Sequence, residues 1–259
     1  MTGCGSSREK NVDFSIQHHS GAKQRPAIVF LHSDAGNKEQ FDSAYYHLKV
    51  QGWSVLSFDR RGHGRSSMPK DARFGYVSES EDVFDVADEA GFERIALVGH
   101  SGGGAVAFKA ANDRPDRVAA LLLVDPAPDP AVIPKSQTTE SINAMRKDFK
   151  ATIGEYYRSI AGPDPRIAEQ IVATAKATPS ATVIGLSEQI YEFKPRDYAA
   201  RFTGPAHAII QPQFDVEGAL HRIQPGMTHE AIEGSGHWIH MAASEKFEAS
   251  LDRFLTRLP

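Results

Sequence analysis

A serine stands at the centre of the segment Gly99-His100-Ser101-Gly102-Gly103, and its hydroxyl has the surroundings of a nucleophile. Four apolar residues, 95–98, precede this segment, and an apolar, helix-compatible stretch, 105–111, follows it. The pattern predicts a strand, a sharp turn and a helix, with Ser101 at the apex of the turn. Glycine at 99 and 103 keeps Cβ atoms out of the space where strand and helix cross. We expect strained backbone to lift the hydroxyl clear of the sheet, next to the N–H groups that begin the helix.

A serine hydroxyl is a weak nucleophile until a base takes its proton, and histidine is the side chain suited to this task near neutral pH. The chain has 11 histidines. We select His237 as the base, because it follows the last expected strand in the glycine-rich segment Gly234-Ser235-Gly236-His237-Trp238. The residues expected to line the substrate pocket are His32, Asp34, His100 and Trp238.

A carboxylate must accept the second imidazole N–H, which fixes the tautomer and orientation of the base. Two aspartates are candidates. Asp125 ends the apolar strand that follows the helix after Ser101, and Asp215 follows the next expected strand, 205–210. The segment from Asp215 to His237 is short by about one or two helical turns. We favour Asp125 and keep Asp215 as the alternative acid.

Acyl transfer also needs two N–H donors placed where the oxyanion develops. The backbone of Gly102, directly after the serine, is expected to supply one of them. The backbone of Ser33, in the loop after the first buried strand, is expected to supply the other. Removal of one such donor costs about 3 kcal/mol of barrier.

The elements that must position these residues alternate between apolar strands and helices. Strands are predicted at 26–31, 53–58, 94–98 and 118–124, with helices at 39–51, 81–90 and 105–112 between them. Strands that are apolar throughout indicate a parallel sheet covered by helices on both faces, and the chemistry of such sheets gathers at the carboxyl ends of the strands. An edge strand is predicted at 12–17.

No buried strand is predicted from 126 to about 202, where apolar residues instead recur at helical spacing. One helix is expected at 141–160 and others at 166–176 and 182–193. The strand pattern then resumes at 205–210 and 227–232, with helices at 217–223 and 244–258. We therefore expect a core of 12–128 and 203–259, a helical cap of 129–202 over the catalytic edge, and a disordered N-terminus of 1–11.

The bulk composition narrows the classes of partner. The chain has 259 residues and a formal net charge of −4, which gives no electrostatic basis for binding nucleic acid or an anionic membrane. The single cysteine, Cys4, and the lack of an apolar leader lead us to expect a cytoplasmic protein without disulfides. No metal-ligand cluster, phosphate loop or dinucleotide fingerprint is present, so we expect no metal and no cofactor. The oligomeric state stays open.

Taken together, the motifs resemble those of the α/β-hydrolase-fold superfamily, and specifically its capped serine hydrolases of the esterase and lactonase type. The resemblance runs from about Ile28 to the C-terminus. It rests on four segments in order: His32-Ser33-x-x-Gly36-Asn37, Asp59-Arg60-Arg61-Gly62-His63-Gly64-Arg65-Ser66, the turn at 99–103, and the segment at 234–238. Two departures concern the acid and the oxyanion loop. The family commonly has Gly-x-x-Asp where this chain has Pro212-Gln213-Phe214-Asp215, and it usually has glycine at the position of Ser33.

The resemblance implies a serine hydrolase that cleaves an ester or lactone of a small, largely apolar molecule through an acyl-enzyme. Relatives that open epoxides or remove halides carry aspartate in place of Ser101. A second possibility is hydrolytic carbon–carbon cleavage of a diketone-type acid, for which Arg60 or Arg61 would bind the substrate carboxylate. A third is a protein of this fold that only binds a small ligand.

Overall fold

The protein is built on one seven-stranded sheet, seen in a computed structural model that describes residues 11–22 and 24–258. The spatial order of the strands is β1-β3-β2-β4-β5-β6-β7. Only β1 is antiparallel to its neighbour β3, and all other pairs are parallel. The strands are β1 Ile16–His19, β2 Ala27–Leu31, β3 Val55–Phe58, β4 Ile95–His100, β5 Val118–Val124, β6 Ala206–Ile210 and β7 Thr228–Ala231. The predicted α/β-hydrolase architecture is thus confirmed.

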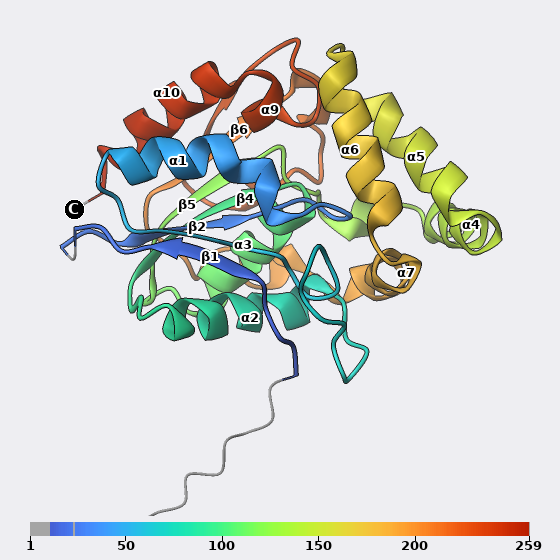
Figure 1. The fold of residues 1–259 in the computed structure, drawn as a ribbon, viewed down its shortest axis with the longest axis horizontal. Coiled ribbons are helices and arrows are strands. Elements are labelled where there is room, and N and C mark those ends of the chain that lie inside the picture. The colour runs from blue at the N-terminus through green and yellow to red at the C-terminus, as the bar shows by residue number, and fades with distance from the viewer. Residues whose placement is uncertain (1–10, 23, 259) are drawn as a thin grey trace, which may run out of the picture.

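Helices cover both faces of this sheet, as the apolar strands require. Figure 1 shows α1 (Asp42–Val50) and α10 (Ser244–Leu255) over one face, and α2 (Tyr76–Glu89) and α3 (Gly102–Asp113) over the other. Alternate residues of β2 serve the two cores: Ile28 and Phe30 join the cluster with α1 and α10, whereas Val29 and Leu31 join the cluster with α2 and α3. This two-sided burial fixes the register of the central strands, because a shift by one residue would exchange the two cores.

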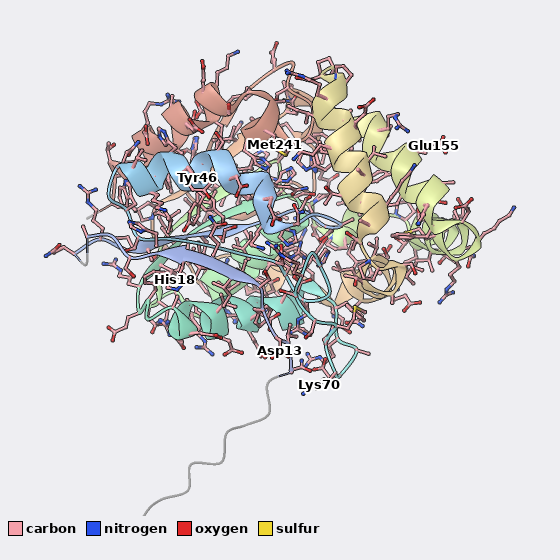
Figure 2. All side chains as sticks on the ribbon, viewed as in Figure 1. Asp13, His18, Tyr46, Lys70, Glu155 and Met241 are labelled. Carbon is pink, nitrogen blue, oxygen red and sulfur yellow. The ribbon has the colours of Figure 1, made fainter. Side chains whose placement is uncertain are left out.

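Four helices are inserted between β5 and β6 and gather at one end of the sheet (Figure 1). They are α4 Lys135–Lys147, α5 Phe149–Ile160, α6 Pro165–Ala177 and α7 Ser180–Gln189. Their apolar side chains form a third cluster, which also takes in Ala35 and Trp238 from loops of the sheet domain. The outer side of α5 is polar, and Glu155 points away from the cluster (Figure 2). We call residues 129–202 the inserted segment.

The stripe at 141–160 belongs to two helices rather than the one predicted. The break falls at Asp148, whose backbone is extended (φ −150°, ψ 90°) and whose side chain accepts a hydrogen bond from the N–H of Ala151 at 3.0 Å. An aspartate in this position caps a new helix, since it satisfies an N–H that has no partner within the helix. Periodicity alone does not reveal such a break, because apolar spacing continues across it.

Other predicted boundaries also shift. The helix predicted at 81–90 begins at Tyr76, the one predicted at 217–223 shortens to α8 Leu220–Ile223, and the edge strand begins at Ile16. Short helical turns complete the chain: η1 Lys38–Phe41, η2 Pro130–Val132, η3 Ile190–Glu192, η4 Pro195–Asp197, η5 Pro212–Phe214 and α9 Ile239–Ala242.

The predicted disordered N-terminus lies outside the described residues, as does Cys4, except for Asn11. Its Oδ1 accepts hydrogen bonds from the N–H groups of Lys70 and Asp71 at 3.0 and 3.3 Å. Within the part of the chain that the structure describes, no helix combines the length and apolar character needed to cross a membrane.

Candidate active site

Ser101 lies at the turn between β4 and α3, in backbone that is strained. Its φ of 54° and ψ of −122° lie in a region that residues with a side chain rarely adopt. The N–H of Ser101 donates to the carbonyl of Val124 at 3.0 Å, which ties the turn to the end of β5. A Cβ on Gly99 would collide with the carbonyl of Gly103, and one on Gly103 would collide with the carbonyls of Leu31 and His32 at the end of β2. The two glycines therefore permit the close crossing that the sequence predicts.

His237 and Asp125 meet behind this turn. Nδ1 of His237 lies 2.7 Å from Oδ2 of Asp125, and both side chains are buried. The other oxygen of Asp125 accepts the N–H of Gln211 at 3.0 Å, so the carboxylate is held from two sides. Asp125 itself has a positive φ of 43°, another strained position at the end of a strand. A carboxylate fixed in this way directs the remaining imidazole nitrogen away from itself.

Asp215 does not contact His237. Its carboxylate accepts hydrogen bonds from Arg222 at 2.6 and 2.9 Å and from Nε2 of His221 at 2.9 Å. The hydrogen bonds from Arg222, followed by that from His221, lower the pKa of Asp215 below its ordinary value. The preceding residue, Phe214, is the one that reaches the base, with ring centroids 5.2 Å apart from His237.

Ser101 and His237 open into a common cavity of about 200 Å³. Asp34 and Trp238, both expected in the pocket, line it as well. The rest of the lining is apolar or aromatic and comes from the sheet loops and the inserted segment: Tyr76, Pro126, Ala127, Pro128, Ile133, Tyr156, Tyr157, Ile160, Ile190 and Phe214.

His32 and His100, which the sequence places in the pocket wall, do not line the cavity and are fully buried. Nε2 of His32 accepts the N–H of Arg60 at 2.9 Å, and its Nδ1 lies 2.7 Å from the carbonyl of Ser33. Nε2 of His100 lies 2.9 Å from the carbonyl of His237. Burial lowers the pKa of both imidazoles, so they are neutral groups that hold loops.

The N–H of Ser33, which the sequence predicts as an oxyanion donor, already has a hydrogen-bond partner within the protein. It donates to Oε1 of Gln40 at 3.3 Å, and the Ser33 hydroxyl donates to the same atom at 3.0 Å. The next residue, Asp34, lines the cavity, and its N–H has no hydrogen-bond partner among the described residues. The N–H of Gly102 is likewise without a partner within the described chain. Within the described chain, Gly102 beside Ser101 and Asp34 in the cavity lining thus both have an N–H without a partner.

The side chain of Asp34 is held by a buried polar cluster. Its two oxygens accept hydrogen bonds from Nη1 of Arg60 at 2.9 Å and from the Tyr76 hydroxyl at 2.6 Å. Glu79 takes Nε and Nη2 of the same guanidinium at 2.5 and 2.9 Å. The Tyr157 hydroxyl, from α5, donates to the backbone carbonyl of Asp34. Asp34 thus joins the sheet domain to the inserted segment.

Arg60 and Arg61 do not reach the cavity. Arg60 is 1% exposed and enclosed by the cluster around Asp34. Arg61 forms a bidentate ion pair with Asp82, with both distances 2.6 Å. No Lys or Arg side chain lines the cavity among the described residues.

Sequence reasoning did not single out several residues that complete the site. Gln211 holds Asp125, and Gln40 occupies Ser33, yet glutamine in a loop carries no distinctive sequence signal. Tyr156 and Ile160 did belong to the apolar stripe at 141–160, but the stripe does not distinguish residues that face the cavity from residues that face other helices.

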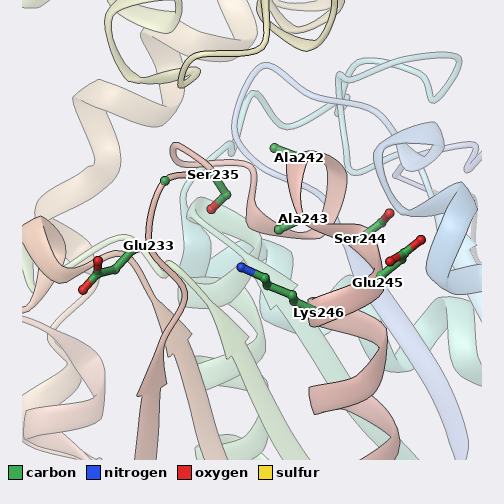
Figure 3. Close-up of a pocket in the computed structure, with 8 residues that line it drawn as sticks. Glu233, Ser235, Ala242, Ala243, Ser244, Glu245 and Lys246 are labelled. Atoms are coloured by element: carbon green, nitrogen blue, oxygen red, sulfur yellow. The ribbon is translucent and has the colours of Figure 1, made fainter.

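Two other features of the surface lack the chemistry of the first cavity. A more open hollow of about 360 Å³ lies beside the start of α10, with Glu233, Ser235 and Lys246 around it, and neither Ser101 nor His237 lines it (Figure 3). Asp215, His221 and His229 bring potential metal ligands within 4.8 Å of one another. Arg222 already binds both carboxylate oxygens of Asp215, and its positive charge opposes a cation there.

Comparison with known proteins shows what the chain is similar to in sequence. A family model for the alpha/beta hydrolase fold matches residues 26–167. An sn-1-specific diacylglycerol lipase, ABHD11 of Xenopus tropicalis, is 28% identical over 270 residues, which cover 94% of this chain and 82% of that protein.

Solved structures agree in fold. The esterase EaEST from Exiguobacterium antarcticum superimposes with a TM-score of 0.81 at 20% identity, covering 95% of this chain and 96% of the other. The enol-lactonase from Burkholderia xenovorans LB400 gives a TM-score of 0.80 at 19% identity, with the same coverage of 95% and 96%.

Proposed function

This chain belongs to the α/β hydrolase fold family and is a hydrolase, and we propose that it cleaves an ester or lactone bond through an acyl-enzyme on Ser101. The observation that carries the proposal is the arrangement of three side chains. Ser101 and His237 share one cavity, and Nδ1 of His237 lies 2.7 Å from a buried carboxylate of Asp125. This combination of nucleophile, base and orienting acid is what acyl transfer requires.

The reaction follows from these positions. Nε2 of His237 takes the proton of Ser101 as its Oγ attacks the acyl carbon, and Asp125 stabilises the imidazolium that forms. The imidazolium then protonates the leaving alkoxide. In the second half, His237 activates a water molecule that attacks the acyl-enzyme, and the acid is released with Ser101 regenerated.

We assign the oxyanion donors to the N–H groups of Gly102 and Asp34. Both lack another partner among the described residues, whereas the N–H of Ser33 is bonded to Gln40. A hydrogen bond to Gln40 competes with an oxyanion for the N–H of Ser33, whereas the N–H groups of Gly102 and Asp34 meet no such competition among the described residues. The Ser33 hydroxyl is committed to the same glutamine oxygen at 3.0 Å.

The substrate we propose is small and largely apolar. The cavity of about 200 Å³ is lined mainly by aromatic, proline and aliphatic side chains. We propose further that residues 129–202 act as a cap, because Ile133, Tyr156, Tyr157, Ile160 and Ile190 of this segment contribute much of that lining. The carbon–carbon cleavage of a diketone-type acid has less support, since Arg60 and Arg61 are both held in ion pairs away from the cavity.

The direct test is covalent labelling. We expect a fluorophosphonate probe to modify the wild-type protein at Ser101, as read by mass spectrometry of the digested chain, and to leave Ser101→Ala unlabelled. A p-nitrophenyl ester series from acetate to octanoate measures the acyl length that the cavity accepts. Absence of both labelling and ester hydrolysis would refute the proposed function, and would favour a protein that only binds a ligand.

A matched pair of variants tests the acid. Asp125→Asn should lower kcat by about 100-fold or more, because asparagine cannot stabilise the imidazolium and favours the wrong tautomer. Asp215→Asn should leave kcat within about threefold, since Asp215 is bonded to Arg222 and His221 rather than to His237. Steady-state kinetics on one p-nitrophenyl ester measures both, and the opposite ranking would transfer the role to Asp215.

A further inference from the structure

A carboxylate lies inside the otherwise apolar cavity. Among the described residues that line it, Asp34 is the only acidic one, and its side chain is 25% exposed. A charged group in an apolar cavity costs free energy unless a partner compensates it. Its presence beside Ser101 and His237 therefore bears on which substrates the cavity accepts.

The partners of Asp34 leave its carboxylate partly exposed in the cavity wall. Arg60 gives Asp34 one N–H at 2.9 Å, while Glu79 takes two other donors of the same guanidinium. The charge of Arg60 is thus shared between two carboxylates. Tyr76 donates one further hydrogen bond at 2.6 Å. Each oxygen of Asp34 accepts one of these bonds and, since a carboxylate oxygen can accept two, keeps capacity for another donor.

Asp34 also lies close to the reacting centre. A Cβ added to Gly102, the residue directly after Ser101, would collide with the carboxylate of Asp34. The carboxylate therefore touches the backbone on the side of the proposed oxyanion donors. A substrate bound at Ser101 therefore places the atoms around its carbonyl next to Asp34.

We propose that Asp34 determines acyl specificity: it selects ester or lactone acyl groups that carry a protonated amine or a hydroxyl near the carbonyl, and it rejects acyl groups that carry a carboxylate. This inference rests on the proposed function. A donor on the acyl group gives an oxygen of Asp34 its second hydrogen bond and offsets the repulsion between this carboxylate and the developing oxyanion. A second carboxylate adds repulsion in a cavity that lacks a cation among its described lining residues.

Three methyl esters of matched length test the proposal: β-alanine methyl ester, methyl butyrate and monomethyl succinate. These place an ammonium, a methyl and a carboxylate at the same distance from the carbonyl. The measurement is kcat/KM in a pH-stat at pH 7.5 and low salt. The wild-type enzyme should prefer the ammonium ester over the carboxylate ester by about 100-fold, as expected for charges a few ångströms apart in a partly buried site.

Asp34→Asn removes the charge but keeps an oxygen for Arg60 and an amide that can donate to Tyr76. It should reduce the preference for the ammonium ester by at least about tenfold. Methyl butyrate, which carries no charge, measures any general effect of the substitution on the site, and the ammonium ester should lose at least about tenfold more than methyl butyrate does. The control is Asp252→Asn, which removes the same charge from an exposed position on α10, bonded to His47 and Gln51, and should leave all three values unchanged.

The outcomes separate the inference from the proposed function. If the wild-type protein shows neither fluorophosphonate labelling nor p-nitrophenyl ester hydrolysis, the proposed function itself is refuted. Active enzyme with an ammonium-to-carboxylate ratio near one would refute the inference without any variant. An equal effect of Asp34→Asn on all three esters would also refute it, because a purely structural role acts on every substrate alike. The same esters, used as competitors of p-nitrophenyl butyrate, report the preference where turnover is slow.

Discussion

Acid should destabilise this protein through its buried imidazoles, and the contribution of one of them, His240, can be isolated. His240, at the start of the last helical region, is 2% exposed and stacks on Phe41 with ring centroids 4.3 Å apart. Neither of its ring nitrogens has a hydrogen-bond partner among the described residues. Burial, with repulsion from His237 as the smaller cause, lowers the pKa of His240 to about 3. The folded protein therefore keeps this ring neutral at pH values where an unfolded chain would protonate it.

The size of the effect follows from linkage. A histidine in the unfolded chain has a pKa of about 6.5, so the unfolded state binds the extra proton and stability falls as the pH drops below this value. Between pH 7.5 and pH 5 the loss is about 2 kcal/mol for each such histidine. The figure changes little with the folded-state value, because pH 5 lies well above it. His63, whose pKa burial lowers to about 4, contributes a similar loss. Together they remove about 4 kcal/mol, a large part of the stability of an ordinary domain.

The assay is urea unfolding followed by tryptophan fluorescence at half-unit steps from pH 7.5 to 5. His240→Phe keeps a ring against Phe41 and removes the titrating group, so its free energy of unfolding should depend less steeply on pH, by about 1.3 kcal/mol per unit between pH 5 and 6. Replacement of His18, which lies exposed on β1, by Gln serves as the control for removal of a histidine outside the core. A slope in His240→Phe equal to that of the wild type would refute the reasoning.

Two further substitutions test the supports of the site. Gly236→Ala should lower kcat by at least about tenfold on any ester substrate, because a Cβ there would collide with Gly162 and Ala161 and displace the loop of His237. Gly234→Ala is its matched control: φ is also positive but the space is open, so only the cost of backbone strain should appear, in the melting temperature. Arg60→Met should reduce the free energy of unfolding in urea by about 3–5 kcal/mol, because it leaves a buried carboxylate without its partner. An unchanged unfolding midpoint for Arg60→Met would contradict the assigned ion pair.

The sheet could be predicted from the sequence because each buried strand is a short, continuously apolar run. The segments 118–124 and 205–210 are examples, and the structure places β5 and β6 there within one residue. The strand, turn and helix around Ser101 were equally predictable. Glycine is required at 99 and 103 for a steric reason, because a Cβ at either position would collide with backbone atoms. Helix boundaries were less predictable. Asp148 ends one helix and caps the next, and its effect depends on the backbone it adopts rather than on its neighbours in sequence.

The site was less predictable from the sequence, because its details depend on which side chains pair with one another in the fold. Asp125 and Asp215 both follow strands, and only the fold reveals that Arg222 and His221 bind the second of them. Ser33 stands in the expected loop, but Gln40 occupies its N–H. His32 and His100 stand beside motif residues, yet their side chains turn into the core. Each difference depends on a specific hydrogen bond or side-chain orientation, which apolar periodicity does not encode.

One backbone contact restricts which segments could replace the inserted segment between β5 and β6. The N–H of His237 donates to the carbonyl of Ile160, at the end of α5, at 2.9 Å, and Gly162 packs directly against Gly236. A segment transplanted from another protein between β5 and β6 would have to present a carbonyl at this point and a residue without a side chain next to it. Without them the N–H of His237 would be buried and unpaired, at a cost of about 1–3 kcal/mol. Changes to the cavity are therefore less disruptive when they are made in side chains of α5 than when the whole segment is replaced.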